Sequence, residues 1–101
     1  MATAEREVFN SSRFEIPRHC SPNEARDLRS RVRYALQHGD QHVAVDCRGW
    51  KRFDFGMLSS LIQCAAECRA QGVSFELENM SSEIRADVRA LNLDDRLGLA
   101  C

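Results

Sequence analysis

The sequence lacks several features that would assign it to a specialised class of protein. No apolar run approaches the ~20 residues of a membrane span, and residues 1–12 have no apolar core of the kind that a secretory signal needs. Basic and acidic side chains are balanced, 14 against 15, so the net basic surface typical of nucleic-acid-binding proteins is missing. We therefore expect a cytoplasmic protein that binds no nucleic acid and does not insert into membranes.

Motifs of catalysis and of cofactor binding are missing as well. The glycines do not form the pattern of a phosphate-binding loop, and Ser59 and Ser60 lack the Gly-x-Ser-x-Gly elbow of hydrolases. The three histidines show no metal-ligand spacing, and two cysteines alone do not make a zinc site. Since no catalytic set emerges, we expect a protein that is not an enzyme and that holds neither cofactor nor metal.

Cysteine is the residue type that the chain has in unusual number. Five cysteines in 101 residues are many, but their number is odd and none form a Cys-x-x-Cys pair, which argues against a disulfide framework. Cys64 and Cys68 are spaced to share one face of a helix. We interpret the cysteines as small core residues, with metal or redox chemistry as the alternative, and Cys101 as the most exposed thiol.

The length fits a single domain over residues 1–101, in which residues 1–7 are expected to be disordered. Val8-Phe9 and the alternating residues 14–16 predict a short pair of strands around a turn at residues 10–12.

A first helix is predicted to begin at Ser21. This serine is followed by proline at the first helical position and by Glu24, which is placed to complete a capping box, and Gly39 is placed to end the helix. A basic stripe runs beside the apolar face of this helix and is formed by Arg26, Arg29 and Arg33. We interpret it as either a solvated face or a partner-docking surface.

The remaining elements alternate between strand and helix. Residues 42–47 predict a central buried strand, residues 56–71 a second helix capped by Asp54, and residues 73–77 a half-exposed strand. Ser81 is placed to cap a third helix. Strands separated by helices of this length imply right-handed crossovers and a largely parallel sheet.

The loop before the second helix is both aromatic and basic. Trp50 and Phe53 are expected to point into the core, whereas Phe55 stands just after the presumed cap, beside Lys51 and Arg52. An exposed aromatic side chain next to two cations has the composition of an interaction hot spot, although core packing is an equal alternative for Phe55.

The order of these segments resembles the STAS domain, the fold of bacterial anti-sigma-factor antagonists. The resemblance spans residues 14–99 and is carried by three segments: residues 43–50 (VAVDCRGW), residues 53–58 (FDFGML) and residues 70–81 (AQGVSFELENMS). The family has Asp-Ser-Ser-Gly-Leu-Gly where the second of these segments stands. The resemblance implies a mixed sheet of about four to five strands flanked by about four helices.

The resemblance also implies a role in binding. Antagonists of the family bind a serine kinase that is also an anti-sigma factor, and phosphorylation of the motif serine breaks that complex. In this sequence Phe55 replaces the modifiable serine and Gly56 the serine after it, so Phe55 cannot accept a phosphoryl group. Ser59 and Ser60, one turn later, are the candidate substitute sites.

These observations favour a non-catalytic regulatory module that binds a protein partner in partner switching without phosphate control. The expected partner is an anti-sigma factor or serine kinase; the alternative is the ATPase of a phospholipid-transport ABC complex, with this chain as its accessory STAS subunit. We expect a monomer or weak dimer. The predicted partner-binding residues are Lys51, Asp54, Phe55, Gly56, Met57, Leu58 and Ser81.

Overall fold

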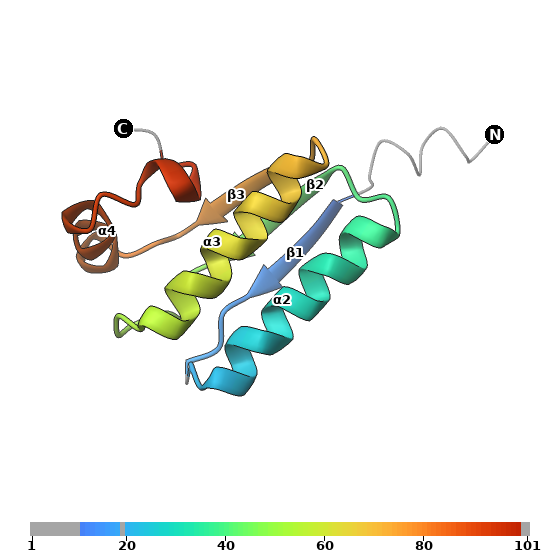
Figure 1. Ribbon diagram of the computed structural model, residues 1–101. Coiled ribbons are helices and arrows are strands. Elements are labelled where there is room, and N and C mark those ends of the chain that lie inside the picture. The colour runs from blue at the N-terminus through green and yellow to red at the C-terminus, as the bar shows by residue number, and fades with distance from the viewer. Residues whose placement is uncertain (1–10, 19, 100–101) are drawn as a thin grey trace.

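The computed structural model describes residues 11–18 and 20–99, in which strands and helices alternate along the chain (Figure 1). The elements are β1 (Ser11–Glu15), α2 (Pro22–Gln37), β2 (His42–Asp46), α3 (Phe55–Ala70), β3 (Ser74–Glu78), α4 (Ser82–Ala90) and the 3-10 helix η1 (Asp95–Leu97). The predicted disorder of residues 1–7 and the predicted strand at Val8-Phe9 lie outside the described residues.

The sheet has the order β1-β2-β3, and all pairs are parallel. The largely parallel sheet and the central place of β2 are thus confirmed. The described residues form three strands and three α-helices, fewer than the four to five strands and four helices expected, and the sheet they form is not mixed. The turn predicted at residues 10–12 is also wrong for Ser11 and Ser12, which lie in β1, where the Ser12 hydroxyl donates to Asp40.

Both long helices cover the same face of the sheet (Figure 1). Consecutive strands that are also neighbours, joined by crossovers of one hand, place their helices on one side. Val43 and Val45 of β2 are fully buried on this side, and the half-buried Phe14 and Leu77 pair with Val45 in the register. The alternate positions form the opposite face, which is polar.

Each α-helix begins where its capping residue predicts. The side-chain oxygens of Ser21, Asp54 and Ser81 accept hydrogen bonds from the amides of the third following residues, at 3.2, 2.7 and 3.1 Å. The end of α2 is confirmed as well. Gly39 adopts a left-handed φ of 86° and its amide donates to the Leu36 carbonyl.

Helices α2 and α3 lie side by side and are joined by polar contacts. Arg29 donates to the Gln63 side chain and Arg33 pairs with Glu67, each at 2.9 Å. Two of the three arginines in the predicted basic stripe are therefore bound to the neighbouring helix. Only Arg26 of that stripe makes no such contact among the described residues.

The core interpretation of the cysteines is confirmed for Cys47, Cys64 and Cys68, which are buried free thiols. Burial raises the pKa of Cys47 and of Cys64 to about 12, and that of Cys68 to about 11. These thiols are therefore protonated and inert at neutral pH. Cys20 is half-buried, and Cys101 lies outside the described residues.

Candidate functional site at the carboxyl edge of the sheet

The connections that follow the three strands meet at one edge of the sheet. In a parallel sheet all carboxyl ends point the same way, and such an edge is where ligands of open α/β sheets usually bind. Here residues 16–21 follow β1, residues 47–54 follow β2 and residues 79–81 follow β3. Figure 1 shows that α2, α3 and α4 all begin at this end of the molecule.

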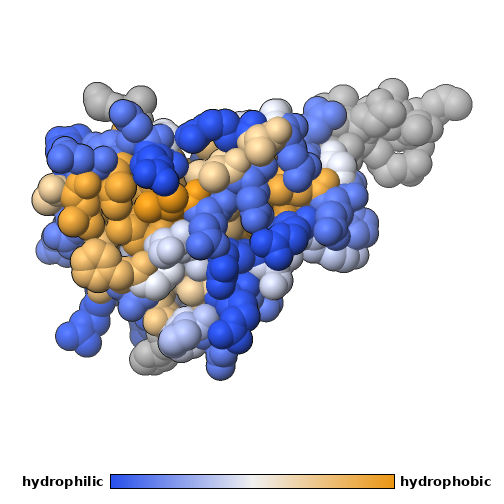
Figure 2. Space-filling view, viewed as in Figure 1, coloured by the Kyte–Doolittle hydropathy of each residue, from blue (hydrophilic) through white to orange (hydrophobic). Residues whose placement is uncertain are grey.

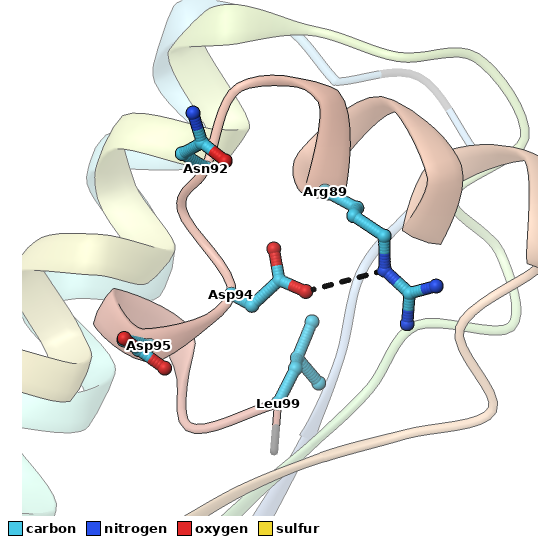
Figure 3. A pocket seen from close by; sticks show the side chains of 5 residues that line it. All are labelled: Arg89, Asn92, Asp94, Asp95 and Leu99. Carbon is cyan, nitrogen blue, oxygen red and sulfur yellow. Dashed lines mark hydrogen bonds and ion pairs between the residues drawn. The ribbon is translucent and has the colours of Figure 1, made fainter. Parts of the chain in front are cut away.

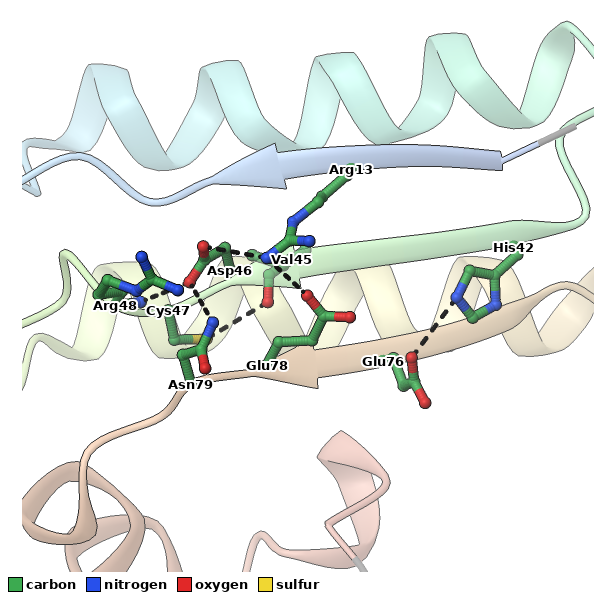
Figure 4. Close-up of polar contacts among 9 residues, drawn as sticks. All are labelled: Arg13, His42, Val45, Asp46, Cys47, Arg48, Glu76, Glu78 and Asn79. Carbon is green, nitrogen blue, oxygen red and sulfur yellow. Dashed lines mark hydrogen bonds and ion pairs between the residues drawn. The ribbon is translucent and has the colours of Figure 1, made fainter. Parts of the chain in front are cut away.

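Asp46, the last residue of β2, links these connections (Figure 4). It is 5% exposed, and its Oδ1 accepts from the Arg48 amide at 2.9 Å and from the Asn79 side chain at 3.1 Å. Its Oδ2 accepts from Arg13 at 3.2 Å, and Arg13 also pairs with Glu78 at 2.9 Å. One carboxylate therefore binds groups from or just after each of the three strands.

These hydrogen bonds lower the pKa of Asp46 below its ordinary value. The Arg48 amide contributes most, followed by the Asn79 side chain, and partial desolvation works in the opposite direction. Because the folded-state pKa is lowered, the stabilisation is present above the pKa of the unfolded chain and is lost as pH falls through the folded value. Asp46 remains ionised at neutral pH and is a positioning residue for the loops.

The loop after β2 also lies close to the loop after β1. A Cβ atom added at Gly49 would stand 2.5 Å from the carbonyl oxygen of Ile16, which is a backbone atom. Position 49 therefore requires glycine, because any side chain would push the two connections apart.

Three aromatic rings lead from the core to the surface at this edge. Trp50 is buried and stacks on the half-buried Phe53, with ring centroids 6.2 Å apart. Phe53 meets Phe55 edge to face at 4.9 Å, and Phe55 is 68% exposed. The inward positions expected of Trp50 and Phe53 are thus found, and of the two alternatives for Phe55 the structure has the exposed one.

The other predicted partner-binding residues divide into exposed and supporting ones. Lys51 and Gly56 are exposed, and Asp54 and Ser81 are half-buried caps. Met57 and Leu58 are buried, so they belong to the core beneath the surface. We call the exposed residues Arg18, Lys51, Arg52 and Phe55 the carboxyl-edge surface.

The two serines proposed as substitute modification sites have different surroundings. Ser59 is exposed, whereas Ser60 is 3% exposed and its hydroxyl donates to the Ala25 carbonyl of α2 at 3.0 Å. Burial between two helices removes Ser60 from the reach of a kinase in the folded protein. Modification of Ser59 remains a prediction.

Sequence reasoning missed Arg18 as part of this site. An open pocket of about 500 Å³ lies at the starts of α2 and α3, and its lining residues are Arg18, Cys20, Ser21, Arg52, Phe53 and Asp54. The signal that could have found Arg18 is its position directly after the first strand, since all such loops meet at one edge.

Two further pockets of similar size lie away from this edge. One, of about 500 Å³, lies between the end of α4 and η1, where Arg89 and Asp94 pair at 3.5 Å (Figure 3). The other, of about 570 Å³, lies between β1 and α2 and includes Phe14, Tyr34 and His38. Within residues 11–18 and 20–99, no group of three or more His, Cys, Asp or Glu side chains could hold a metal ion.

A family model described as "Mlab, STAS domain" matches residues 4–99. The chain belongs to the STAS domain family. No curated protein and no solved structure matches the chain significantly. Membership of this family supports a general regulatory or binding role for the STAS domain described here. None of the helices in the described part of the chain is long and apolar enough to cross a bilayer.

Proposed function

We propose that this STAS domain is a non-catalytic regulatory module that binds a protein partner through its carboxyl-edge surface. The observation that carries the proposal is the exposure of Phe55, 68%. The resemblance to the family's motif aligns this residue with the modifiable serine. A large apolar side chain that is exposed next to basic residues is typical of an interface anchor.

The geometry around Phe55 supports this role. Phe55 is the first residue of α3, the Asp54 cap fixes the start of that helix, and the Phe53 ring packs against the Phe55 ring. The aromatic side chain is therefore held in place before a partner arrives, which lowers the cost of binding.

The first candidate partner is the anti-sigma factor or serine kinase of a partner-switching pathway. With Phe55 in place of serine, the surface carries no phosphate switch at this position, and the protein would act like a permanently unphosphorylated antagonist. In this reading the domain regulates transcription in a bacterial cytoplasm.

The second candidate is the ATPase of a phospholipid-transport ABC complex, with this chain as its accessory subunit. The matching family carries the Mlab description and not that of the anti-sigma-factor antagonists, which is the observation that favours this candidate. Both candidates use the same surface.

The test is capture of the partner from a lysate of the source organism on immobilised protein, followed by mass spectrometry. Phe55→Ala should lose the partner or weaken its binding by at least tenfold. The matched control is Tyr34→Ala, since Tyr34 is an aromatic residue of similar exposure, 62%, on α2. Equal capture by both variants would refute the proposed surface, and the identity of the captured protein decides between the two candidates.

A further inference from the structure

The carboxyl-edge surface carries cations that the described residues leave without an acidic partner. Arg18, Lys51 and Arg52 are exposed and form no ion pair within residues 11–18 and 20–99. By contrast, Arg31 pairs with Asp27 and Arg33 with Glu67 on the long helices. Although the whole chain has a formal charge of −1, this edge is locally positive.

One acidic residue lines this pocket, and another lies in the first turn of α2. Asp54 lines the pocket, but its carboxylate accepts from the Met57 amide as the cap of α3. Glu24 lies in the first turn of α2. Both carboxylates lie at helix starts, where they offset the positive ends of the helix dipoles, and the pocket lining holds two cations, Arg18 and Arg52, against the one carboxylate of Asp54.

The basic pocket and the exposed ring form one continuous surface. Phe53 lines the pocket that also contains Arg18 and Arg52, and its ring is in edge-to-face contact with the ring of Phe55. Figure 2 shows apolar side chains gathered at the end of the molecule where α3 begins and α4 lies, next to hydrophilic ones. A partner that covers Phe55 would therefore place its neighbouring side chains beside the cations.

We infer that the partner presents an acidic segment to this surface, in which Asp or Glu side chains flank an apolar side chain. The apolar side chain covers Phe55, and the carboxylates face Arg18, Lys51 and Arg52. This inference rests on the proposed function and specifies the chemistry of the partner. Charge complementarity of this kind selects the partner and speeds its association.

A phage-displayed library of random dodecapeptides tests the inference without knowledge of the partner. Selection on the wild-type protein should enrich peptides in which Asp or Glu adjoins an aromatic or aliphatic residue. A synthetic copy of an enriched peptide should bind roughly tenfold more weakly to the Arg52→Glu variant, and should also weaken as salt is raised. Chemical-shift changes should map to residues 18 and 51–55.

The matched control is Arg96→Glu, which makes the same charge change on η1, near the opposite end of α3. This variant should keep wild-type affinity. Three results would each overturn the inference. They are selection of basic or uncharged peptides, an equal loss of affinity in Arg52→Glu and Arg96→Glu, and equal enrichment of the same peptides on the wild-type protein and on the Phe55→Ala variant. So would binding to anionic lipid vesicles that Arg52→Glu abolishes, because the occupant would then be a membrane surface.

The two proposals fail separately. If the lysate partner depends on Phe55 but the selected peptides carry no acidic residues, the proposed function stands and the acidic segment is wrong. If acidic peptides are selected but Phe55→Ala still captures the lysate partner, the surface has the inferred chemistry and the function must be assigned elsewhere.

Discussion

Helices α2 and α3 have the same length, 16 residues, and lie side by side on one face of the sheet, yet their outer surfaces differ completely. Between positions 26 and 33 helix α2 carries five charged residues, and four of its exposed or neighbouring charged side chains form two ion pairs, Arg31 with Asp27 and Arg33 with Glu67 of α3. Between positions 55 and 66 helix α3 carries none. Residues on its outer side include Phe55, Ser59, Ile62 and Ala66.

The difference shows that the exposed fraction of an aromatic ring does not by itself indicate a binding site, because the neighbouring residues decide how well water solvates the ring. Tyr34 on α2 is 62% exposed, but its ring packs against the tilted His38 ring with centroids 3.9 Å apart, and its hydroxyl can bind water. Phe55 is exposed to a similar extent, has no polar atom and begins an uncharged stretch of helix. We therefore interpret α2 as a solvated helix, and the contrast supports the interaction surface that we propose at the start of α3.

The largest effect should come from a charge placed between the two helices. Ser60→Asp would bury a carboxylate beside the Ala25 carbonyl, so it should lower the free energy of unfolding by about 3–5 kcal/mol. Ser59→Asp, one residue away on the exposed side, should change it by less than about 0.5 kcal/mol. Urea denaturation measures both, and equal losses would contradict the division of α3 into a buried and an exposed side.

The next largest effect should be a difference in the rates at which individual cysteines react with a thiol reagent. With a pKa raised from 9.0 to about 12, Cys64 has roughly a thousandfold less thiolate at pH 8 than an ordinary cysteine. Among the four cysteines within residues 11–18 and 20–99, Cys20, half-buried before α2, should react first. Mass spectrometry of the native protein follows the order, and labelling should accelerate as pH rises. Labelling of Cys64 as fast as Cys20 would mean that α3 is not held in the core.

Loss of a cap should have a smaller effect, of about 1 kcal/mol in each helix. Ser21→Ala removes the acceptor for the Glu24 amide, and Asp54→Ala removes that for the Met57 amide. The two losses should respond differently to salt, because only Asp54 also carries a charge at the helix dipole. Asp54→Asn keeps the acceptor without the charge and should recover most of the stability. Thermal unfolding at low and high salt distinguishes these cases.

The ion pair between the helices should contribute least. Arg33→Ala breaks the 2.9 Å contact with Glu67, but both side chains are accessible to solvent, so the loss of stability should be smaller than either cap loss and should vanish at high salt. A double-mutant cycle with Glu67→Ala measures the coupling. A coupling as large as a cap loss would show that these helices depend on surface charge for their packing.

The features that the sequence predicts well are local ones. Ser21, Asp54 and Ser81 accept hydrogen bonds from amides only three residues away, and Gly39 ends its helix by its own backbone conformation. These interactions therefore lie within a few consecutive residues, where the sequence alone reveals them. The buried residues of β2 were also predictable, because Val43-Ala44-Val45 is a short apolar run of the kind that a central strand carries.

The features that the sequence did not predict depend on contacts between distant segments. The burial of Ser60 requires α2 against α3, and the polar residues Ser11 and Ser12 look like a turn until β1 pairs with β2. The exposure of Phe55 depends on the direction in which the first turn of α3 faces. The spacing of apolar residues along the helix does not determine that direction. The link from Asp46 to Arg13 and Asn79 spans 33 residues in either direction.

That link, together with the close approach of Gly49 to Ile16, has a consequence for the energetics of recognition. The loops at the carboxyl edge are tied to each other and to the sheet, so a partner meets a backbone that is already ordered. A flexible loop loses roughly 1–2 kcal/mol of conformational entropy for each residue that binding immobilises. Here that loss was incurred when the domain folded, and only the side chains at the rim remain to be ordered.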